Sequence, residues 1–170
     1  TVAPELNSGT YASVVVTDTA NYGYNTICMP FALTDSDMKE LFGANYEAYE
    51  LKSYNNNAIN FSATTTFYAG YPYIVYTAEP GSDKLYKQNV QITASANYDE
   101  RNNQNTSLAT SAKFQGTFAP MSSTDLNGMV WMDSRGYLNE VSESTALKGF
   151  RAFFQADGGQ ANYLTFTNIA

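Results

Sequence analysis

Residues 11–17 read Tyr-Ala-Ser-Val-Val-Val-Thr, a short apolar run rich in β-branched side chains. Residues 90–96 read Val-Gln-Ile-Thr-Ala-Ser-Ala, in which apolar and polar side chains alternate. Both patterns are typical of β-strands, because successive side chains of a strand point to opposite faces. Similar runs, bounded by Asn, Gly, Ser and Asp, lie at residues 25–29, 46–51, 58–61, 65–68, 73–77, 112–119, 129–132, 150–155 and 163–169. About ten short strands at close spacing predict an all-β fold, a two-sheet β-sandwich or a jelly roll.

One segment, residues 35–42, has the pattern of a helix. Thr34 precedes it as a suitable N-cap, and Gly43 follows it as a residue that commonly ends helices. Acidic residues in its first turn suit the positive end of the helix dipole. Its apolar side chains recur at i, i+3 and i+4 and form one face: Met38, Leu41 and Phe42. We therefore expect one small helix that covers an edge or an end of the sheets.

Length and composition indicate a single globular domain over residues 1–170. The chain has 170 residues, of which 44% are hydrophobic, and this is enough for a full core. Only 15% are charged, against roughly a quarter in ordinary soluble domains, so Asn, Ser, Thr and Tyr must supply the polar surface. A net charge of -7 and scattered Lys and Arg residues argue against nucleic acid and anionic membranes as partners. No apolar run is long enough to span a bilayer, so we also expect no membrane insertion.

The start of the chain and its single cysteine bear on where the protein works. The chain begins with Thr1 and no signal peptide is visible, so we interpret it as a piece of a longer or processed secreted protein. Cys28 is the only cysteine, which leaves no partner for an internal disulfide. Its neighbours Ile27, Met29 and Phe31 are apolar, and we expect a buried thiol that only packs.

Residues capable of catalysis are scarce. Histidine is absent, which excludes Ser-His-Asp and Cys-His nucleophiles and every histidine metal site. Two carboxylates suffice for glycoside hydrolysis, but the spacing of Glu47 and Glu50 on an expected strand puts them on opposite faces. We therefore expect no enzyme. Asp125, Asn127 and Asp133 could offer oxygen atoms to Ca²⁺, but their spacing matches no calcium loop, so we expect no cofactor.

Aromatic residues are the strongest functional signal, at 15% of the chain with 14 Tyr. A flat, exposed ring can stack on the C–H face of a sugar, while neighbouring polar groups bond its hydroxyls. Three pairs offer such rings: Tyr22 with Tyr24, Tyr71 with Tyr73, and Trp131 with Tyr137. Each pair can equally be cross-strand packing. Tyr71 and Tyr73, beside the rigid Pro72, are our second choice of ligand site.

Trp131 and Tyr137 are the first choice. They flank residues 133–136, Asp-Ser-Arg-Gly, a turn sequence that predicts a hairpin with the two rings on paired strands. Asp133 and Arg135 would then lie beside the rings, where their polar groups can bond hydroxyls directionally. The alternative, a Trp131 that fills the core, stays open.

Five segments occur in a recognisable order: Asn-Thr-Ile-Cys-Met-Pro-Phe at 25–31, Tyr-Glu-Leu at 49–51, Ala-Gly-Tyr-Pro-Tyr-Ile-Val at 69–75, Phe-Gln-Gly-Thr-Phe-Ala-Pro at 114–120 and Gly-Phe-Arg-Ala-Phe-Phe at 149–154. This order resembles a β-rich module of secreted and cell-surface Bacteroidetes proteins, with motifs of the type CLPF, AGxPY, GxFxP and FRAYF. Met29 and Phe153 stand where that module usually has Leu and Tyr. Arg151, a charge among Phe side chains, needs a carboxylate or carbonyl partner if it lies in a strand.

The resemblance implies an extracytoplasmic accessory module found beside adhesive, repeat-containing or polysaccharide-degrading partners. Together with the uncharged polar surface and the tyrosines, it favours a non-catalytic carbohydrate-binding module of an extracellular or bacterial cell-surface protein. Its partner would be a polysaccharide or oligosaccharide, and the module would be tethered to other domains of its parent chain. The alternative is a structural or adhesive surface module that binds no sugar.

Overall fold

The protein is described by a computed structural model, in residues 9–17, 22–55, 58–79, 81, 84–92, 112–156 and 163–167. Within these residues the chain forms three sheets and a single short helix. The prediction of an all-β, sandwich-like fold with one short helix is confirmed. The ends of two expected strands, residues 93–96 and 168–169, lie outside the described residues.

In chain order the elements are β1 (Gly9–Thr17), β2 (Gly23–Cys28), α1 (Asp35–Phe42), β3 (Glu47–Asn55), β4 (Ala58–Ala63), β5 (Pro72–Thr77), β6 (Lys84–Ile92), β7 (Ala112–Thr117), β8 (Met129–Met132), β9 (Leu138–Glu140), β10 (Arg151–Ala156) and β11 (Tyr163–Thr167). The run at 11–17 lies inside β1, which pairs antiparallel with β6 as a two-stranded sheet. Residues 65–68, expected as a strand, instead form a bend at Thr65 and a single isolated antiparallel bridge from Phe67 to Leu33. The Thr64 hydroxyl accepts the backbone N–H of Thr66 at 3.0 Å, a local bond that competes with strand pairing.

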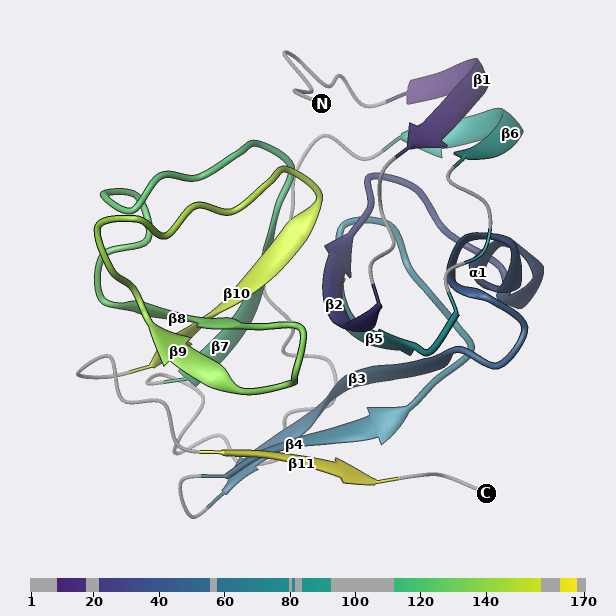
Figure 1. Cartoon of the computed structure of the whole chain (residues 1–170). Coiled ribbons are helices and arrows are strands. Elements are labelled where there is room, and N and C mark those ends of the chain that lie inside the picture. Colours follow the sequence, from purple (N-terminus) through teal and green to yellow (C-terminus); the bar gives the residue numbers. More distant parts are fainter. Residues whose placement is uncertain are drawn as a thin grey trace.

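A five-stranded sheet in the order β11-β4-β3-β5-β2 occupies the centre of the fold. Its pairs are antiparallel, except that β11 pairs parallel with β4. Figure 1 shows β2 and β5 between the four-stranded sheet on one side and α1 on the other. Both faces of this part of the sheet are therefore covered. That is why β5 reads Pro-Tyr-Ile-Val-Tyr-Thr, a nearly continuous apolar run without strict alternation.

The four-stranded sheet, in the order β7-β10-β8-β9, packs on the central sheet as the second layer of a β-sandwich. Aromatic rings fill the space between them. The ring of Phe61 meets Phe114 and Phe154 edge to face, with centroid distances of 5.4 and 6.1 Å. Phe114 and Phe154 stack on each other at 4.8 Å. Smaller side chains complete this core: Leu51, Ile74, Val130 and Ala152.

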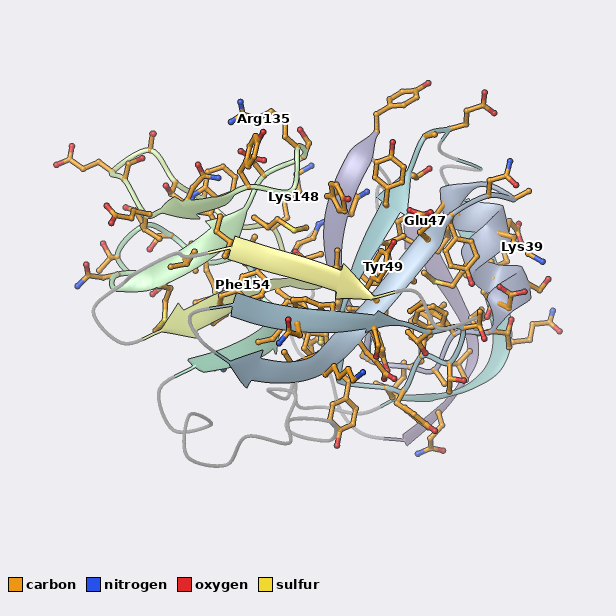
Figure 2. The ribbon with its side chains drawn as sticks, turned by 90° about the horizontal axis from the view of Figure 1, so that it is seen from below. Lys39, Glu47, Tyr49, Arg135, Lys148 and Phe154 are labelled. Carbon is orange, nitrogen blue, oxygen red and sulfur yellow. The ribbon has the colours of Figure 1, made fainter. Side chains whose placement is uncertain are left out.

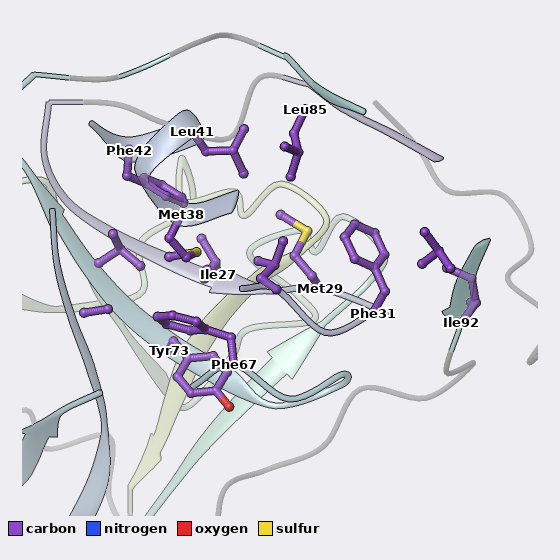
Figure 3. Close-up of a cluster of buried hydrophobic side chains, with 14 residues drawn as sticks. Ile27, Met29, Phe31, Met38, Leu41, Phe42, Phe67, Tyr73, Leu85 and Ile92 are labelled. Atoms are coloured by element: carbon purple, nitrogen blue, oxygen red, sulfur yellow. The ribbon is translucent and has the colours of Figure 1, made fainter. Parts of the chain in front are cut away.

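A second core lies on the opposite face of the central sheet (Figure 3). Its helical part is the predicted apolar face of α1, Met38, Leu41 and Phe42. These side chains pack with residues of β2, β5 and β6: Ile27, Tyr73, Val75 and Leu85. The predicted helix bounds are confirmed, and so is the burial of Cys28, which is 0% exposed.

The two sheets of the sandwich meet at a corner between β2 and the start of β10. The Thr26 hydroxyl bonds both the backbone N–H and the carbonyl of Ala152, at 3.1 and 3.0 Å. The buried Arg151 guanidinium donates to the Thr26 carbonyl at 3.3 Å, the kind of partner that the sequence required. Phe150 has a φ of 61°, and its carbonyl accepts the Cys28 N–H at 3.0 Å. Among the described residues, no helix is long and apolar enough to span a bilayer.

Candidate functional site

The predicted hairpin is present between β8 and β9. Gly136 donates its N–H to the Asp133 carbonyl, and Asp133 donates its own to the Tyr137 carbonyl, both at 2.9 Å. Gly136 has a φ of 86°, a left-handed conformation that glycine adopts without steric cost. Trp131 pairs with Asn139 across the hairpin, while Tyr137 lies just before β9. The two rings that the sequence placed on paired strands are therefore not direct cross-strand neighbours.

The Asp133 carboxylate holds the turn in shape. It accepts the backbone N–H groups of Arg135 and Tyr137 at 2.9 and 3.1 Å. It also accepts side-chain bonds from Arg135 at 3.0 Å and from Asn139 at 3.1 Å. Burial alone would raise the pKa of Asp133, but these hydrogen bonds outweigh it and keep the pKa below its ordinary value. The carboxylate therefore serves its own turn rather than standing open to a ligand hydroxyl.

Tyr137 presents its ring to solvent at the base of this turn. The residue is 61% exposed, and the Arg135 guanidinium carbon lies 4.9 Å from the ring centroid. Arg135 is in turn bound to Asp133, so the cation restrains the ring against a turn that is itself hydrogen-bonded. An exposed aromatic ring held in this way loses little conformational entropy when a ligand stacks on it.

Trp131 fits neither of the two alternatives that the sequence left open. Its neighbour Val130 is 1% exposed and points into the sandwich core, so Trp131 points to the outer face of the same sheet. Its exposure is intermediate, and its indole nitrogen is buried without a hydrogen-bond partner among the described residues. Trp131 thus packs on the outer face of the sheet, neither inside the core nor as an open platform.

The second-choice site is not an exposed pair of rings. Tyr73 is 2% exposed and belongs to the core under α1, and its hydroxyl accepts the backbone N–H of Tyr68 at 2.8 Å. Tyr71 is half-buried and packs against the same core. We correct this prediction for Tyr73, because a ring enclosed on both faces cannot stack on a sugar. The reason is that both faces of β5 are covered.

Of the remaining pair, Tyr22 and Tyr24, Tyr24 lies against the hairpin turn. The Tyr24 backbone N–H donates to the Ser134 carbonyl at 2.8 Å. A Cβ atom added to Gly136 would lie 2.9 Å from Cδ2 and Cε2 of Tyr24, so the ring rests directly on the turn. Tyr22, two residues before Tyr24, is 71% exposed. Tyr24 and the turn that carries Tyr137, which are far apart in the sequence, thus meet at one end of the sandwich.

Two further residues extend this surface along the central sheet. Tyr76 pairs with Tyr24 on one side and with Glu47 on the other, so the three residues form a row across β2, β5 and β3. The Tyr24 and Tyr76 rings lie 5.0 Å apart. We call the surface formed by Tyr22, Tyr24, Tyr76 and Tyr137 the tyrosine strip, with Glu47 at its end. Sequence reasoning missed Tyr76 and the place of Glu47, because no local pattern reveals which strands are neighbours.

Figure 2 shows Glu47 and Tyr49 together on β3, with Arg135 on the other side of β2. The Tyr49 hydroxyl donates to Oε2 of Glu47 at 3.2 Å. Burial, followed by the charge of Glu47, raises the pKa of Tyr49 to about 12. Burial also raises the pKa of Tyr24, again with help from Glu47. Glu47 lies on the face of Tyr49, and Glu50 on the other face, as the strand spacing predicted.

The two carboxylates considered for Ca²⁺ are both engaged in local turns. Asp125 accepts the N–H and the hydroxyl of Ser122 at 2.9 and 3.1 Å and so closes a local turn. The Asp133 carboxylate is used by the hairpin. Within the described part of the chain, no three Cys, Asp or Glu side chains gather as metal ligands would.

No family model matches this sequence, and comparison with curated proteins and with solved structures found no match either.

Proposed function

We propose that this chain is a non-catalytic carbohydrate-binding module, and that the tyrosine strip is its binding surface. The observation that carries the proposal is Tyr137, an exposed ring held by Arg135 on a turn that Asp133 braces. Tyr22, which directly precedes β2 and lies two residues before the Tyr24 contact with the turn, adds a second exposed aromatic residue. Sugar-binding surfaces need flat rings that are held rigidly. Each contact between a sugar and a ring is weak, so it cannot offset the entropy lost when a mobile loop that carries the ring becomes ordered.

The resemblance to modules of secreted Bacteroidetes proteins supports the place of action. We propose an extracellular or cell-surface module that is tethered to other domains of a polysaccharide-degrading parent chain. The low content of charged residues, 15%, also suits an uncharged partner. We further propose that the module does no chemistry itself, since Glu47 and Glu50 point to opposite faces of β3.

Affinity gels cast with plant and host polysaccharides test the proposal. We expect at least one polysaccharide to retard the protein in the gel. Tyr137→Ala should weaken the affinity for that polysaccharide about tenfold, or ~1.4 kcal/mol of binding free energy. Tyr86→Ala is the matched control, since Tyr86 is 70% exposed but lies on β6, in the separate two-stranded sheet. Thermal melts should be nearly unchanged for both variants, because both rings are exposed.

The same incubations should release no reducing sugar. A folded protein that no polysaccharide retards would contradict the proposal and favour a structural or adhesive module. Equal loss of binding in Tyr137→Ala and Tyr86→Ala would contradict the assignment of the site.

A further inference from the structure

The row formed by Tyr24, Tyr76 and Glu47 joins a carboxylate to the tyrosine strip. The strand register puts these residues opposite one another on adjacent strands. Neighbouring strands lie about 4.8 Å apart, so all three side chains share one face over a short distance. A sugar that contacts the Tyr76 ring would therefore have its hydroxyls within reach of Glu47.

Glu47 is held in position by the core. Its partner Tyr49 is 4% exposed and packs in the sandwich core with Leu51 and Ile74. The raised pKa of Tyr49 means that its hydroxyl remains a hydrogen-bond donor at every ordinary pH. The other carboxylate oxygen, Oε1, has no hydrogen-bond partner among the described residues, and Glu47 is exposed to solvent. Glu47 thus offers one oriented acceptor beside the rings.

The charges along the strip differ in how they are balanced. Arg135 is neutralised by Asp133, whose carboxylate accepts from the turn as well. Glu47 has no cation bound to it among the described residues. The chain as a whole carries a net charge of -7. An acceptor with uncompensated negative charge favours hydroxyl donors and repels carboxylated or sulfated sugars.

We propose that Glu47 determines the specificity of the strip, and that the ligand is an uncharged polysaccharide whose hydroxyls donate to this carboxylate. This inference rests on the proposed function, since it names the ligand class of the same site. Tyr49 acts as a positioning residue, because it touches Glu47 and not the ligand.

The test uses the neutral polysaccharide that retards the protein most, and the same polymer after oxidation of its primary alcohols to carboxylates. The wild-type protein should bind the neutral form at least about tenfold more tightly. Glu47→Gln should weaken binding of the neutral polymer severalfold, since a charge-assisted hydrogen bond becomes a neutral one, and should narrow the gap between the two polymers. Glu40→Gln, the same change on the exposed face of α1, is the matched control and should change neither affinity.

A double-mutant cycle tests the role of Tyr49. Tyr49→Phe should weaken binding in the wild-type background but have no further effect in the Glu47→Ala background, because Ala at position 47 leaves no acceptor for the Tyr49 hydroxyl to position. If Tyr137→Ala abolishes binding while Glu47→Gln leaves it intact, the inference about Glu47 fails and the carbohydrate-binding proposal stands. A preference for the oxidised polymer would also overturn the inference alone. Failure to bind any polysaccharide would overturn both.

Discussion

Gly136 is the residue on which the contact between the two sheets at the site depends. Its left-handed φ of 86° closes the turn, and its missing Cβ leaves room for the Tyr24 ring. The same glycine therefore meets two requirements, one of backbone conformation and one of packing. Asp133 and Arg135 complete the local support by bracing the turn and the Tyr137 ring.

A pair of glycine substitutions separates the two requirements. Gly128 has a similar φ of 80°, but a Cβ added there would meet nothing within 4 Å. Both Gly136→Ala and Gly128→Ala should lose about 1–2 kcal/mol of unfolding free energy from the left-handed backbone. Only Gly136→Ala should also displace Tyr24, destabilise the protein further and weaken polysaccharide binding. Chemical denaturation and affinity gels measure both effects, and equal behaviour of the two variants would contradict the packing role of Gly136.

Helix α1 shows how one element is joined to its neighbours by its first turn. Thr34 and Asp37 form a capping box, in which each side chain accepts the other's backbone N–H, at 3.1 and 2.9 Å. The Asp37 carboxylate also forms an ion pair with Lys87 of β6. This ion pair thus connects α1 to the two-stranded sheet, and α1 and β6 both contribute side chains to the same core.

Acid should weaken this connection in a defined direction. Burial alone would raise the pKa of Asp37, but hydrogen bonds from Lys87 and Thr34 outweigh it, and the pKa in the folded protein lies below its ordinary value. The stabilisation is therefore present above about pH 3.9, the value in the unfolded chain, and is lost as the pH falls through the lower folded pKa. Asp37→Asn should melt at a lower temperature than wild type at pH 7, and the difference should shrink toward pH 2. A difference that stays constant across this range would contradict the assignment.

At the scale of the whole molecule, the corner between β2 and β10 joins the two layers of the sandwich. The buried Thr26 hydroxyl replaces a strand ladder there, since it bonds both backbone groups of Ala152. The Arg151 guanidinium donates a further hydrogen bond to the Thr26 carbonyl. Phe150 has a left-handed backbone conformation, and its carbonyl accepts the backbone N–H of Cys28. Backbone groups that neither sheet pairs at this edge thus find partners across the corner.

Substitution of Thr26 tests the corner. Thr26→Val keeps the shape of the side chain but leaves the Ala152 N–H and carbonyl without partners, at about 1–3 kcal/mol for each buried group. Thr26→Ser keeps the hydroxyl and should retain most of the stability. Urea denaturation of both variants measures the difference. Equal stability of the Val and Ser variants would show that these bonds do not hold the layers together.

Local rules account for the parts of the fold that the sequence determined by itself. Strand-sized runs with a period of two predicted the all-β class, and Thr34 and Gly43 marked the ends of α1 correctly. The turn sequence at 133–136 predicted the hairpin, and the apolar neighbours of Cys28 predicted its burial. Each of these properties depends on residues within a few positions of one another, so one sequence suffices to derive it.

Only the tertiary structure decided which rings face solvent. Tyr73 and Tyr137 both follow a strand pattern, but one lies under α1 and the other outside the sandwich. Trp131 lies between core and surface, with intermediate exposure on the outer face of its sheet. The meeting of Tyr24 with the hairpin, and the row that Tyr24 forms with Tyr76 and Glu47, require strands that are distant in the chain to become neighbours. Exposure and adjacency depend on what covers each face of a sheet, and a residue's local sequence carries no record of that.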